Sequence, residues 1–246
     1  MISTTAPAAS SDGDGAAGCA PRTTQPARVA AVEDGVTLVL ADGRRVRLAG
    51  LHVPEAGETR ARAHLSGWTG RAVRLAPLEA RDRYGRMVAH VFSADGREWL
   101  QFMVARAGDA IVLPQLSDDP CLAALLRAEA AARSDAAGLW DGVLRIRQAA
   151  DPRLARSAGS VALVEGRVVS VGKTRSNTFL NFGPDWSLDF TVMIPVSDQR
   201  SWGPDALQPD ALEGHRIRVR GYLEEWNGGL IRVRTPAQIE RLDGYD

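Results

Sequence analysis

Two arginines and one glutamate in the first half of the chain have the types and spacing that attack on a phosphodiester requires. Arg47 falls on an alternating strand that runs into a proline-fixed turn, and this turn presents Glu55. Arg86 ends the tight turn Asp82–Arg86. Guanidinium groups neutralise phosphoryl oxygens through paired N–H donors, and a carboxylate can hold or deprotonate a water molecule. The three side chains therefore predict phosphodiester chemistry; the alternative is a surface salt-bridge cluster.

Short strands and packing helices must position these side chains. Alternating apolar residues and Asp-Gly turns predict strands at 28–32, 37–40, 45–51, 73–78 and 87–92. Apolar residues at helical spacing predict helices at Glu58–Trp68, Glu98–Ala107 and Pro120–Ala137. Strands followed by packing helices indicate a mainly β, α+β fold, namely a five-stranded OB-type barrel with helices.

The second half of the chain shows another all-β pattern. Strands are predicted at 161–171, 179–182, 190–194, 217–222 and 230–233, with a short helix at Asp205–Leu212. We expect these elements to form a second small, OB-like β-barrel. The predicted domains are a disordered tail at 1–26, the first barrel at 27–145, a linker at 146–159 and the second β domain at 160–246.

The charge balance limits how the chain could bind nucleic acid. Lys and Arg number 30, Asp and Glu number 30, and the formal net charge is +0. Because nonspecific affinity comes from neutralising phosphates, this balance argues against strong nonspecific binding, though not against a local basic patch. Lys173 is the only lysine, so the arginine usage reflects either bidentate phosphate binding or a GC-rich coding bias. No apolar run reaches transmembrane length, and we expect a monomer.

Cysteine usage and the N-terminus leave the compartment open. Cys19 lies in the predicted tail, so we expect Cys19 and Cys121 to be free thiols. The N-terminus lacks the basic start and apolar core of a secretory signal. Ala16–Cys19 is similar to a lipoprotein cleavage box, but no apolar segment precedes it. The expected compartment is the cytoplasm by default, or the periplasm or a lipoprotein location if the true start lies upstream.

Several motifs follow one another in a fixed order between residues 28 and 140. They are Asp34-Gly35-x-Thr37-Leu38, then Arg47-Leu48-x-Gly50-Leu51-x-x-Pro54-Glu55, then Asp82-Arg83-Tyr84-Gly85-Arg86 with Ala89, and finally Leu125-Leu126-x-Ala128-Glu129 through Ala132-Arg133 to Gly138-Leu139-Trp140. This ordered set resembles the thermonuclease (staphylococcal nuclease-like) family. Each motif alone is weak, whereas the ordered set is specific.

The resemblance implies an OB-fold and calcium-dependent hydrolysis of DNA and RNA to products with a 3′-phosphate. Arg47 and Arg86 match the two catalytic arginines of the family, and Glu55 matches its catalytic carboxylate. Arg83-Tyr84 matches positions that contact the terminal phosphate of the substrate. Trp140 matches a structural tryptophan at the end of a helix.

Two departures from the family affect the calcium site. Val36 stands where the family has a calcium-binding aspartate, and His52 stands at the second aspartate ligand. Ca²⁺ takes oxygen ligands, whereas valine offers none and imidazole offers a nitrogen better suited to transition metals. The predicted metal site, Asp34 with His52, is therefore weakened for Ca²⁺ or holds another divalent metal; the alternative is a structural His52. Pro114 and Leu116 replace base-stacking tyrosines, which weakens single-strand stacking.

The last strands carry a second candidate nucleic-acid surface. Basic and apolar residues alternate along His215–Arg220, and Arg232 and Arg234 follow on the next strand. Such a sheet face could track a nucleic-acid backbone. The candidate stacking rings are Trp186, Trp202 and Trp226. Because Glu224-Glu225 follows the basic strand, an ordinary solvated face is the preferred interpretation. This half also resembles, more weakly, the OB-like C-terminal extension of some bacterial thermonuclease-like proteins.

Two functional hypotheses follow. The first is a nuclease-family protein that hydrolyses phosphodiester bonds of DNA or RNA with a degenerate calcium site. The second is a catalytically silent module that binds nucleic acid, or a protein partner through the C-terminal domain. The changes at Val36 and His52 favour the catalytically silent module. The active nuclease is favoured by the presence of all three charged residues, Arg47, Glu55 and Arg86.

Overall fold

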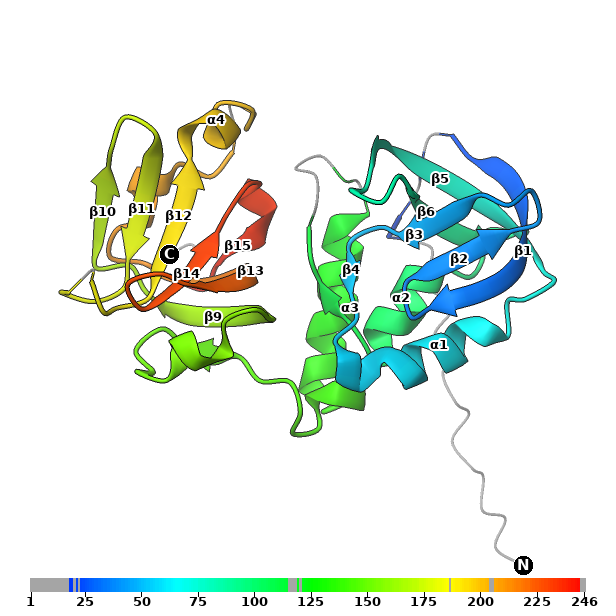
Figure 1. The fold of residues 1–246 in the computed structure, drawn as a ribbon, viewed down its shortest axis with the longest axis horizontal. Helices are drawn as coiled ribbons and strands as arrows, with labels where there is room; N and C mark the ends of the chain where they lie inside the picture. The colour runs from blue at the N-terminus through cyan, green and yellow to red at the C-terminus, as the bar shows by residue number, and fades with distance from the viewer. Residues whose placement is uncertain are drawn as a thin grey trace, which may run out of the picture.

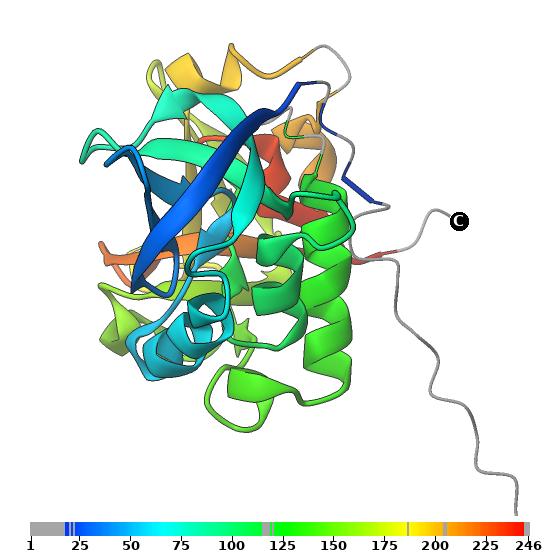
Figure 2. The same ribbon diagram turned by 90° about the vertical axis from the view of Figure 1, so that its right-hand side faces the viewer.

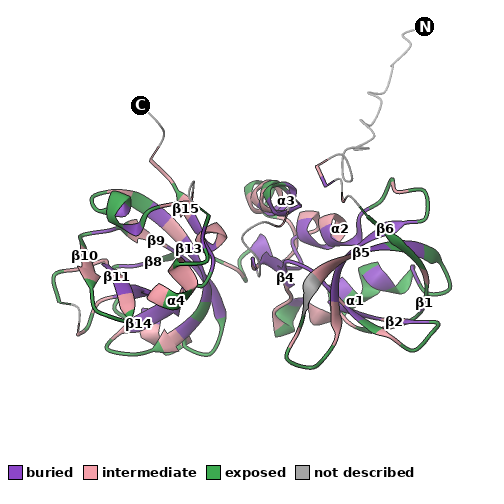
Figure 3. Ribbon diagram, turned by 90° about the horizontal axis from the view of Figure 1, so that it is seen from above, coloured by how far each residue is buried: buried purple, intermediate pink, exposed green. Residues whose placement is uncertain are grey.

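The computed structural model describes residues 18–19, 21, 23–114, 119, 121–185, 187–203 and 206–243, without the side chains of residues 79 and 80. The N-terminal strands and helices lie on one side of the molecule and the C-terminal sheet lies on the other (Figure 1). Each part is built around its own cluster of buried apolar side chains. Figure 3 shows the buried residues on the inner strands and facing helices, and the exposed ones on the outer loops.

The N-terminal part is a closed five-stranded barrel, as the sequence predicts. Its strands, in hydrogen-bonded order, are β1 (Gln25–Asp34), β2 (Thr37–Leu40), β3 (Arg45–Leu48), β6 (Met87–Ser93) and β5 (Ala72–Arg81). The β3–β6 pair is parallel, and the other pairs are antiparallel. Alternation on β3 buries Val46 and Leu48 in the core and leaves Arg47 half-buried between them. This alternation sets the direction in which Arg47 leaves the barrel wall.

Three helices close the barrel, and the three helices predicted for this part of the chain are confirmed with slightly shorter bounds. They are α1 (Glu58–Ser66), α2 (Leu100–Arg106) and α3 (Leu122–Ser134). Leu125, Ala128 and Ala132 recur at helical spacing on α3 and are buried. Gly108 follows α2 with φ 76°, and a side chain there would collide with the carbonyl of Ala137. Figure 2 shows α3 running along one side of the barrel.

Short elements link the barrel to these helices. Strand β4 (Leu51–His52) pairs with β7 (Ile111–Val112) in a separate two-stranded sheet. The 3₁₀ turn η1 (Glu55–Gly57) leads into α1, and η2 (Gly138–Trp140) follows α3. Trp140 is buried, in agreement with its predicted structural role. In the part of the chain that the structure describes, no helix has both the length and the apolar character needed to cross a bilayer.

The C-terminal part is one sheet with short helical turns. Its strands are β8 (Arg147–Gln148), β9 (Val161–Arg167), β10 (Ser170–Lys173), β11 (Asn177–Asn181), β12 (Thr191–Pro195), β13 (Arg216–Glu225), β14 (Gly229–Arg232) and β15 (Ile239–Arg241). The turns are η3 (Leu154–Ser157), α4 (Val196–Gln199), η4 (Pro209–Leu212) and η5 (Pro236–Gln238). The order is β10-β11-β12-β14-β13-β9-β8, with β15 also paired to β13.

This sheet is not closed into the second barrel that the sequence predicts. The ladder on β9 ends at Arg167, and the ladder on β10 begins at Ser170. Between them Val168 N donates to His215 O, and Val169 N donates to Asn181 O, so the chain changes partners there. Because these two residues continue neither ladder, β9 and β10 remain separate strands in the sheet order. The predicted domain boundaries stay predictions, although β8 and the buried Leu154 lie within the predicted linker.

A small apolar cluster joins the two parts. Ile111, Ala132 and Trp140 of the N-terminal part pack with Val161 and Leu163 of β9. Burial of apolar area in such a contact is favourable by about 25 cal/mol per Å². The cluster therefore stabilises one arrangement of the barrel against the sheet.

The basic strand β13 is paired with carboxylates and does not present the free basic face considered from the sequence. Arg218 Nη2 lies 2.6 Å from Glu165 Oε1, and its Nη1 lies 3.1 Å from Glu240 Oε2. Arg216 lies 3.5 Å from the same Glu165. Arg220 is buried. These carboxylates stand on the neighbouring strands β9 and β15, and nothing in the spacing along β13 reveals such cross-strand pairs.

The tryptophans predicted as candidates for base stacking differ in their exposure to solvent. Trp202 is buried, and its Nε1 donates to Arg234 O at 3.0 Å, so it belongs to the core. Trp226 is 56% exposed. Trp186 lies outside the described residues. A buried ring cannot stack on a base, so Trp226 alone remains a candidate among the described pair.

The prediction of two free thiols is wrong. Cys19 and Cys121 form a disulfide, and both residues are buried. Cys121 is the residue before α3, so the bond ties the segment at Cys19 to the start of that helix. Gln25, near the end of the predicted tail, pairs with Leu75 in the barrel. A polar stretch in the sequence gives no sign of a partner brought close by the fold, which is why both features were missed.

Removing this disulfide is expected to destabilise the protein by about 2–4 kcal/mol, since it closes a long loop that constrains the unfolded chain. Its two cysteines are separated by 102 residues. The measurement is urea unfolding of the wild type with and without a thiol reductant. The double variant Cys19→Ser/Cys121→Ser is the control and should not respond to the reductant. An unchanged free energy of unfolding for the reduced wild type would contradict this prediction.

Candidate functional site

Arg47 and Arg86 come together on one wall of the barrel. Arg47 lies opposite Thr37 on β2 and beside Val88 on β6. Arg86 immediately precedes β6, and its Nη1 donates to Thr37 Oγ1 at 2.8 Å. The structure thus brings the two predicted arginines to the same threonine, which the sequence reasoning had not singled out. Its alternating position on β2 is the signal that could have found it.

Asp82 fixes the orientation of Arg86. Its Oδ2 accepts from Arg86 Nε at 2.6 Å, and its Oδ1 accepts from the backbone N of Tyr84 and of Arg86, both at 2.9 Å. Gly85 takes φ 75° in this turn, a region that favours glycine. Burial opposes the charged form of Asp82, but the hydrogen bonds from Arg86 and Tyr84 outweigh it, so the pKa of Asp82 lies below its usual value. Arg86 is therefore held by a permanently ionised carboxylate at neutral pH.

Arg47 has a different environment. Its Nη2 donates to Leu51 O at 2.9 Å, and within the described ranges no carboxylate forms an ion pair with it. Burial, followed by the charge of Arg86, lowers the pKa of Arg47 from its ordinary value. An anion bound here would offset the cost of burying the charge of Arg47 and the repulsion between the two guanidinium groups.

Glu55 is not joined to this arginine pair. It begins the turn η1 and is exposed. Its carboxylate makes no hydrogen bond or ion pair with any other residue that the structure describes. Its predicted catalytic role therefore stays a prediction, as do the roles of Arg47 and Arg86.

Arg83 and Tyr84 lie next to Arg86 on the exposed side of the turn. The guanidinium carbon of Arg83 lies 4.8 Å from the centre of the Tyr84 ring, and that of Arg86 lies 5.2 Å from it. Tyr84 is 62% exposed. Cation–π contacts of this kind are attractive and hold the ring beside Arg86. The two residues thus stand where a substrate reaching Arg86 would meet them.

The side chain of Asp34 stabilises its own turn. Asp34 Oδ1 accepts from Val36 N at 2.8 Å, and Oδ2 accepts from Thr37 Oγ1 at 2.9 Å. Arg86 Nη1 lies 3.8 Å from the same Oδ2. Val36 is buried in the barrel core. Asp34 therefore caps a hairpin turn and faces a guanidinium.

His52 lies on β4 between Arg47 and the C-terminal sheet. Its ring contacts the ring of Tyr222 edge-on, with centroids 5.8 Å apart and planes at 73°. Burial, followed by the charge of Arg47, lowers the pKa of His52 to about 4. The imidazole is therefore neutral at physiological pH. The sequence offered no signal for Tyr222, because only tertiary packing brings β13 beside β4.

His52 should make stability depend on pH. Because its folded pKa lies below 6.5, the unfolded chain binds a proton between about pH 6.5 and pH 4 that the folded chain does not. The contribution of the neutral His52 to the free energy of unfolding is complete above about pH 6.5 and is lost as the pH falls toward 4. With allowance for its partial exposure, we expect a loss on the order of 2 kcal/mol.

Urea unfolding at pH 7 and pH 4.5, of the wild type and of His52→Asn, measures this effect. The acid-induced loss of unfolding free energy should be smaller in the variant, because asparagine does not titrate. Equal losses in the two proteins would show that His52 does not contribute.

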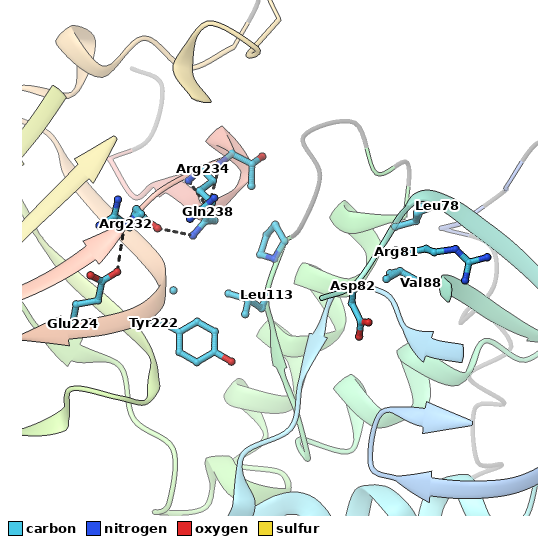
Figure 4. A pocket seen from close by; sticks show the side chains of 13 residues that line it. Leu78, Arg81, Asp82, Val88, Leu113, Tyr222, Glu224, Arg232, Arg234 and Gln238 are labelled. Carbon is cyan, nitrogen blue, oxygen red and sulfur yellow. Dashed lines mark hydrogen bonds and ion pairs between the residues drawn. The ribbon is translucent and has the colours of Figure 1, made fainter. Parts of the chain in front are cut away.

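A cleft adjoins the arginine pair. Its volume is about 560 Å³, and it lies between the barrel and the C-terminal sheet. Figure 4 shows Tyr222 reaching from the sheet toward Leu113, with Asp82 on the barrel side. Pro114, at a position predicted to have lost a stacking tyrosine, lines the cleft. Leu116, the other such position, lies outside the described residues.

Comparison with known proteins identifies the family. The family model described as "Staphylococcal nuclease homologue" matches residues 45–142. Two proteins described as "Uncharacterized endonuclease", from Escherichia coli O157:H7 and from Escherichia coli, are each 38% identical to the chain over 120 residues. Each alignment covers 46% of this chain and 75% of the relative. The chain belongs to the staphylococcal nuclease homologue family. The resemblance to the thermonuclease (staphylococcal nuclease-like) family is thereby confirmed.

Staphylococcal nuclease homologues are typically calcium-dependent and act on nucleic acid. The residues at the expected calcium positions do not match the oxygen ligands that Ca²⁺ takes. Val36 has no donor, Asp34 is bound within its own turn, and His52 offers a nitrogen beside the cationic Arg47. Repulsion by that guanidinium also opposes a cation.

The one group of three potential metal ligands that lie within 4.8 Å of one another among the described residues is elsewhere, at Cys19, His90 and Cys121. Two of its members are already joined in the disulfide. This group therefore does not supply the missing ligands of the nuclease site.

Proposed function

We propose that the protein hydrolyses phosphodiester bonds of DNA or RNA at the Arg47–Arg86 pair, with a degenerate calcium site. The observation that carries this proposal is the half-buried Arg47, which lies beside Arg86 and has no carboxylate partner in the described part of the chain. A phosphate there would supply the negative charge that the Arg47 guanidinium lacks, next to Arg86, which Asp82 already holds.

The two arginines would share the binding of one phosphoryl group. Arg47 uses Nη2 for Leu51 O, and Arg86 uses Nε and Nη1 for Asp82 and Thr37. These contacts leave Nε and Nη1 of Arg47 and Nη2 of Arg86 to donate to phosphoryl oxygens. Such donors, fixed before the substrate arrives, stabilise the charge that develops during attack on phosphorus.

Glu55 would hold or deprotonate the attacking water. Its exposed carboxylate has no competing partner among the residues described, so it is free to accept a hydrogen bond from water. In this proposal the arginines supply the electrostatic stabilisation, and no step depends on the side chains at the calcium positions.

A cleavage assay on one single-stranded DNA and one RNA oligonucleotide tests this proposal. It is run with EDTA, with Ca²⁺ and with Mn²⁺. We expect slow cleavage in all three conditions, with little stimulation by Ca²⁺. Cleavage that requires Ca²⁺ at a saturable site would contradict the degenerate calcium site, and the absence of cleavage in every condition would contradict hydrolysis.

A second candidate is binding of nucleic acid without turnover. It is favoured by the absence of a hydrogen bond or ion pair between Glu55 and the arginine pair, and by the lack of side-chain oxygen ligands at Val36 and His52. Losing a metal that offsets developing charge costs several kcal/mol of transition-state stabilisation. This candidate predicts that the same oligonucleotides bind in the assay and remain intact.

Two further properties of the protein are part of the proposal. We propose that residues 27–145 and 160–246 are separate domains, which is supported by their separate cores. The buried disulfide favours an oxidising compartment, since such bonds are rare where thiols are kept reduced.

A further inference from the structure

The cleft between the barrel and the sheet has two unlike walls. The barrel side contributes Leu78, Val88 and Leu113, which are apolar, together with the charged Arg81 and Asp82. The sheet contributes an aromatic ring and two arginines, which are visible in Figure 4. An apolar surface that meets a ring and cationic donors is suited to a ligand with flat apolar faces and negative charges.

Tyr222 supplies the aromatic ring of this cleft. It is 52% exposed, although it lies on β13 between the two parts of the molecule. Its contact with His52 is edge-on, so the pair is not stacked face to face. An exposed tyrosine face in a cleft is a platform on which a nucleobase can stack.

Arg232 and Arg234 supply the positive charge. Arg234 is exposed, and within the described residues its guanidinium has no carboxylate partner. Arg232 is 3.6 Å from Glu224, a distance at which an exposed pair contributes little. Asp82, on the opposite wall, already has Arg86 as its partner. Arg81, on the barrel side, also lines the cleft and donates to Gly85 O at 3.0 Å. Two of the three arginines that line the cleft are therefore on the sheet.

The cleft and the arginine pair are continuous through shared residues. Asp82 lines the cleft and binds Arg86. Tyr222 lines the cleft and contacts His52, and the residue before His52 accepts a hydrogen bond from Arg47. A strand bound at the arginine pair could therefore continue into the cleft without leaving the protein surface.

We propose that this cleft binds a single-stranded segment of nucleic acid, with a base stacked on Tyr222 and backbone phosphates held by Arg232 and Arg234. The nature of the ligand rests on the function proposed above. A single strand fits because its bases are free to stack on a ring, whereas the bases of a duplex already stack on one another. The C-terminal sheet thereby replaces the stacking side chains that the barrel lacks at Pro114.

Binding of a fluorescent single-stranded DNA oligonucleotide to the full chain tests this proposal. Anisotropy is recorded at low temperature in EDTA, and the integrity of the oligonucleotide is checked on a gel. We expect Tyr222→Ala to weaken binding about five- to hundredfold, and Tyr222→Phe to bind within about twofold of the wild type, because stacking needs the ring and not the hydroxyl. Arg234→Ala should also weaken binding and reduce its dependence on salt.

Matched controls distinguish the cleft from the rest of the surface. Arg97→Ala removes an arginine whose side chain is 87% exposed on the barrel, outside this cleft. This change should not alter binding. The same sequence as a duplex should bind more weakly than the single strand and should not respond to Tyr222→Ala. Circular dichroism confirms that each variant is folded.

Wild-type affinity in a folded Tyr222→Ala variant would overturn the proposal, and so would equal effects on single strand and duplex, or no binding by the wild type. Oligonucleotides that bind as expected and remain uncut in every metal condition would contradict hydrolysis and leave the cleft proposal supported. Cleavage of the oligonucleotides by the wild type, together with wild-type binding by Tyr222→Ala, would support hydrolysis and contradict the cleft proposal.

Discussion

Replacing Arg86 with alanine is expected to lower the rate of phosphodiester cleavage about 10²- to 10³-fold, the usual effect of removing one preorganised donor to a developing oxyanion. Arg86 is held by Asp82 and Thr37, so its remaining donor is already aimed when the substrate binds. Arg86→Lys keeps the charge but loses the planar fork, and it should restore only part of the rate. Single-turnover cleavage of a single-stranded oligonucleotide measures these rates.

Arg45→Ala is the matched control for this prediction. Arg45 lies on the same strand as Arg47, but its side chain is exposed and pairs with Glu33. Its removal should leave the cleavage rate unchanged. An Arg86→Ala protein that folds and cleaves as fast as the wild type would mean that the arginine pair takes no part in catalysis.

The second large effect is expected in stability, at the buried Arg220. Arg220 and Glu129 are both 1% exposed, and their Nη1 and Oε2 atoms lie 2.8 Å apart. Nη1 also donates to Val112 O at 2.8 Å, and Nη2 pairs with Glu240. Burial opposes the charged form of Arg220, but the charges of Glu129 and Glu240 outweigh it, so its pKa is raised. The network joins β13 to α3 and β7 across the two parts of the molecule.

Arg220→Met should destabilise the protein by about 3–5 kcal/mol, because the buried Glu129 loses its partner at 2.8 Å and keeps only Arg133, whose Nη1 lies 3.7 Å away. Urea unfolding followed by circular dichroism measures the loss. Replacing both partners, as in Arg220→Met/Glu129→Leu, removes the buried carboxylate and should recover a large part of it.

Arg153→Met serves as the comparison for Arg220. Its side chain is 76% exposed and lies 3.9 Å from Asp151, so the change should stay within about 0.5 kcal/mol. If Arg220→Met were equally mild, the buried network would not hold the two parts together.

The local pattern of the sequence was sufficient to predict the barrel. Strand β3 and helix α3 show why: Val46 and Leu48 alternate on one face, and Leu125, Ala128 and Ala132 recur at helical spacing. Burial of such a face determines the element type and its orientation. The position of Arg47 on the barrel wall follows from the same alternation.

Contacts between distant elements could not be predicted in this way. Arg220 belongs to a strand of alternating basic residues, and only the packing of β13 against α3 shows that Glu129 is its partner. Tyr222 follows two residues later and reaches His52 for the same reason. Both depend on how the two parts of the molecule meet, which no spacing within a strand encodes.

The site itself was predicted in part. The expected Arg47 and Arg86 meet at Thr37, whereas Glu55 forms no hydrogen bond or ion pair with either arginine. Motif order indicates which residues belong to one surface, but the direction of an exposed side chain on a 3₁₀ turn depends on its solvent and on what binds there.

The phosphate site formed by Arg47 and Arg86 is tested most directly by the salt dependence of oligonucleotide binding. The dissociation constant of one single-stranded DNA is measured over a range of salt concentrations for the wild type, Arg47→Ala, Arg86→Ala and the Arg45→Ala control. Each variant of the pair should bind more weakly, with a slope of log affinity against log salt smaller by about 0.7, the value for one lost phosphate contact on a single strand. Unchanged affinity and slope in folded Arg47→Ala and Arg86→Ala would contradict a phosphate site at this pair.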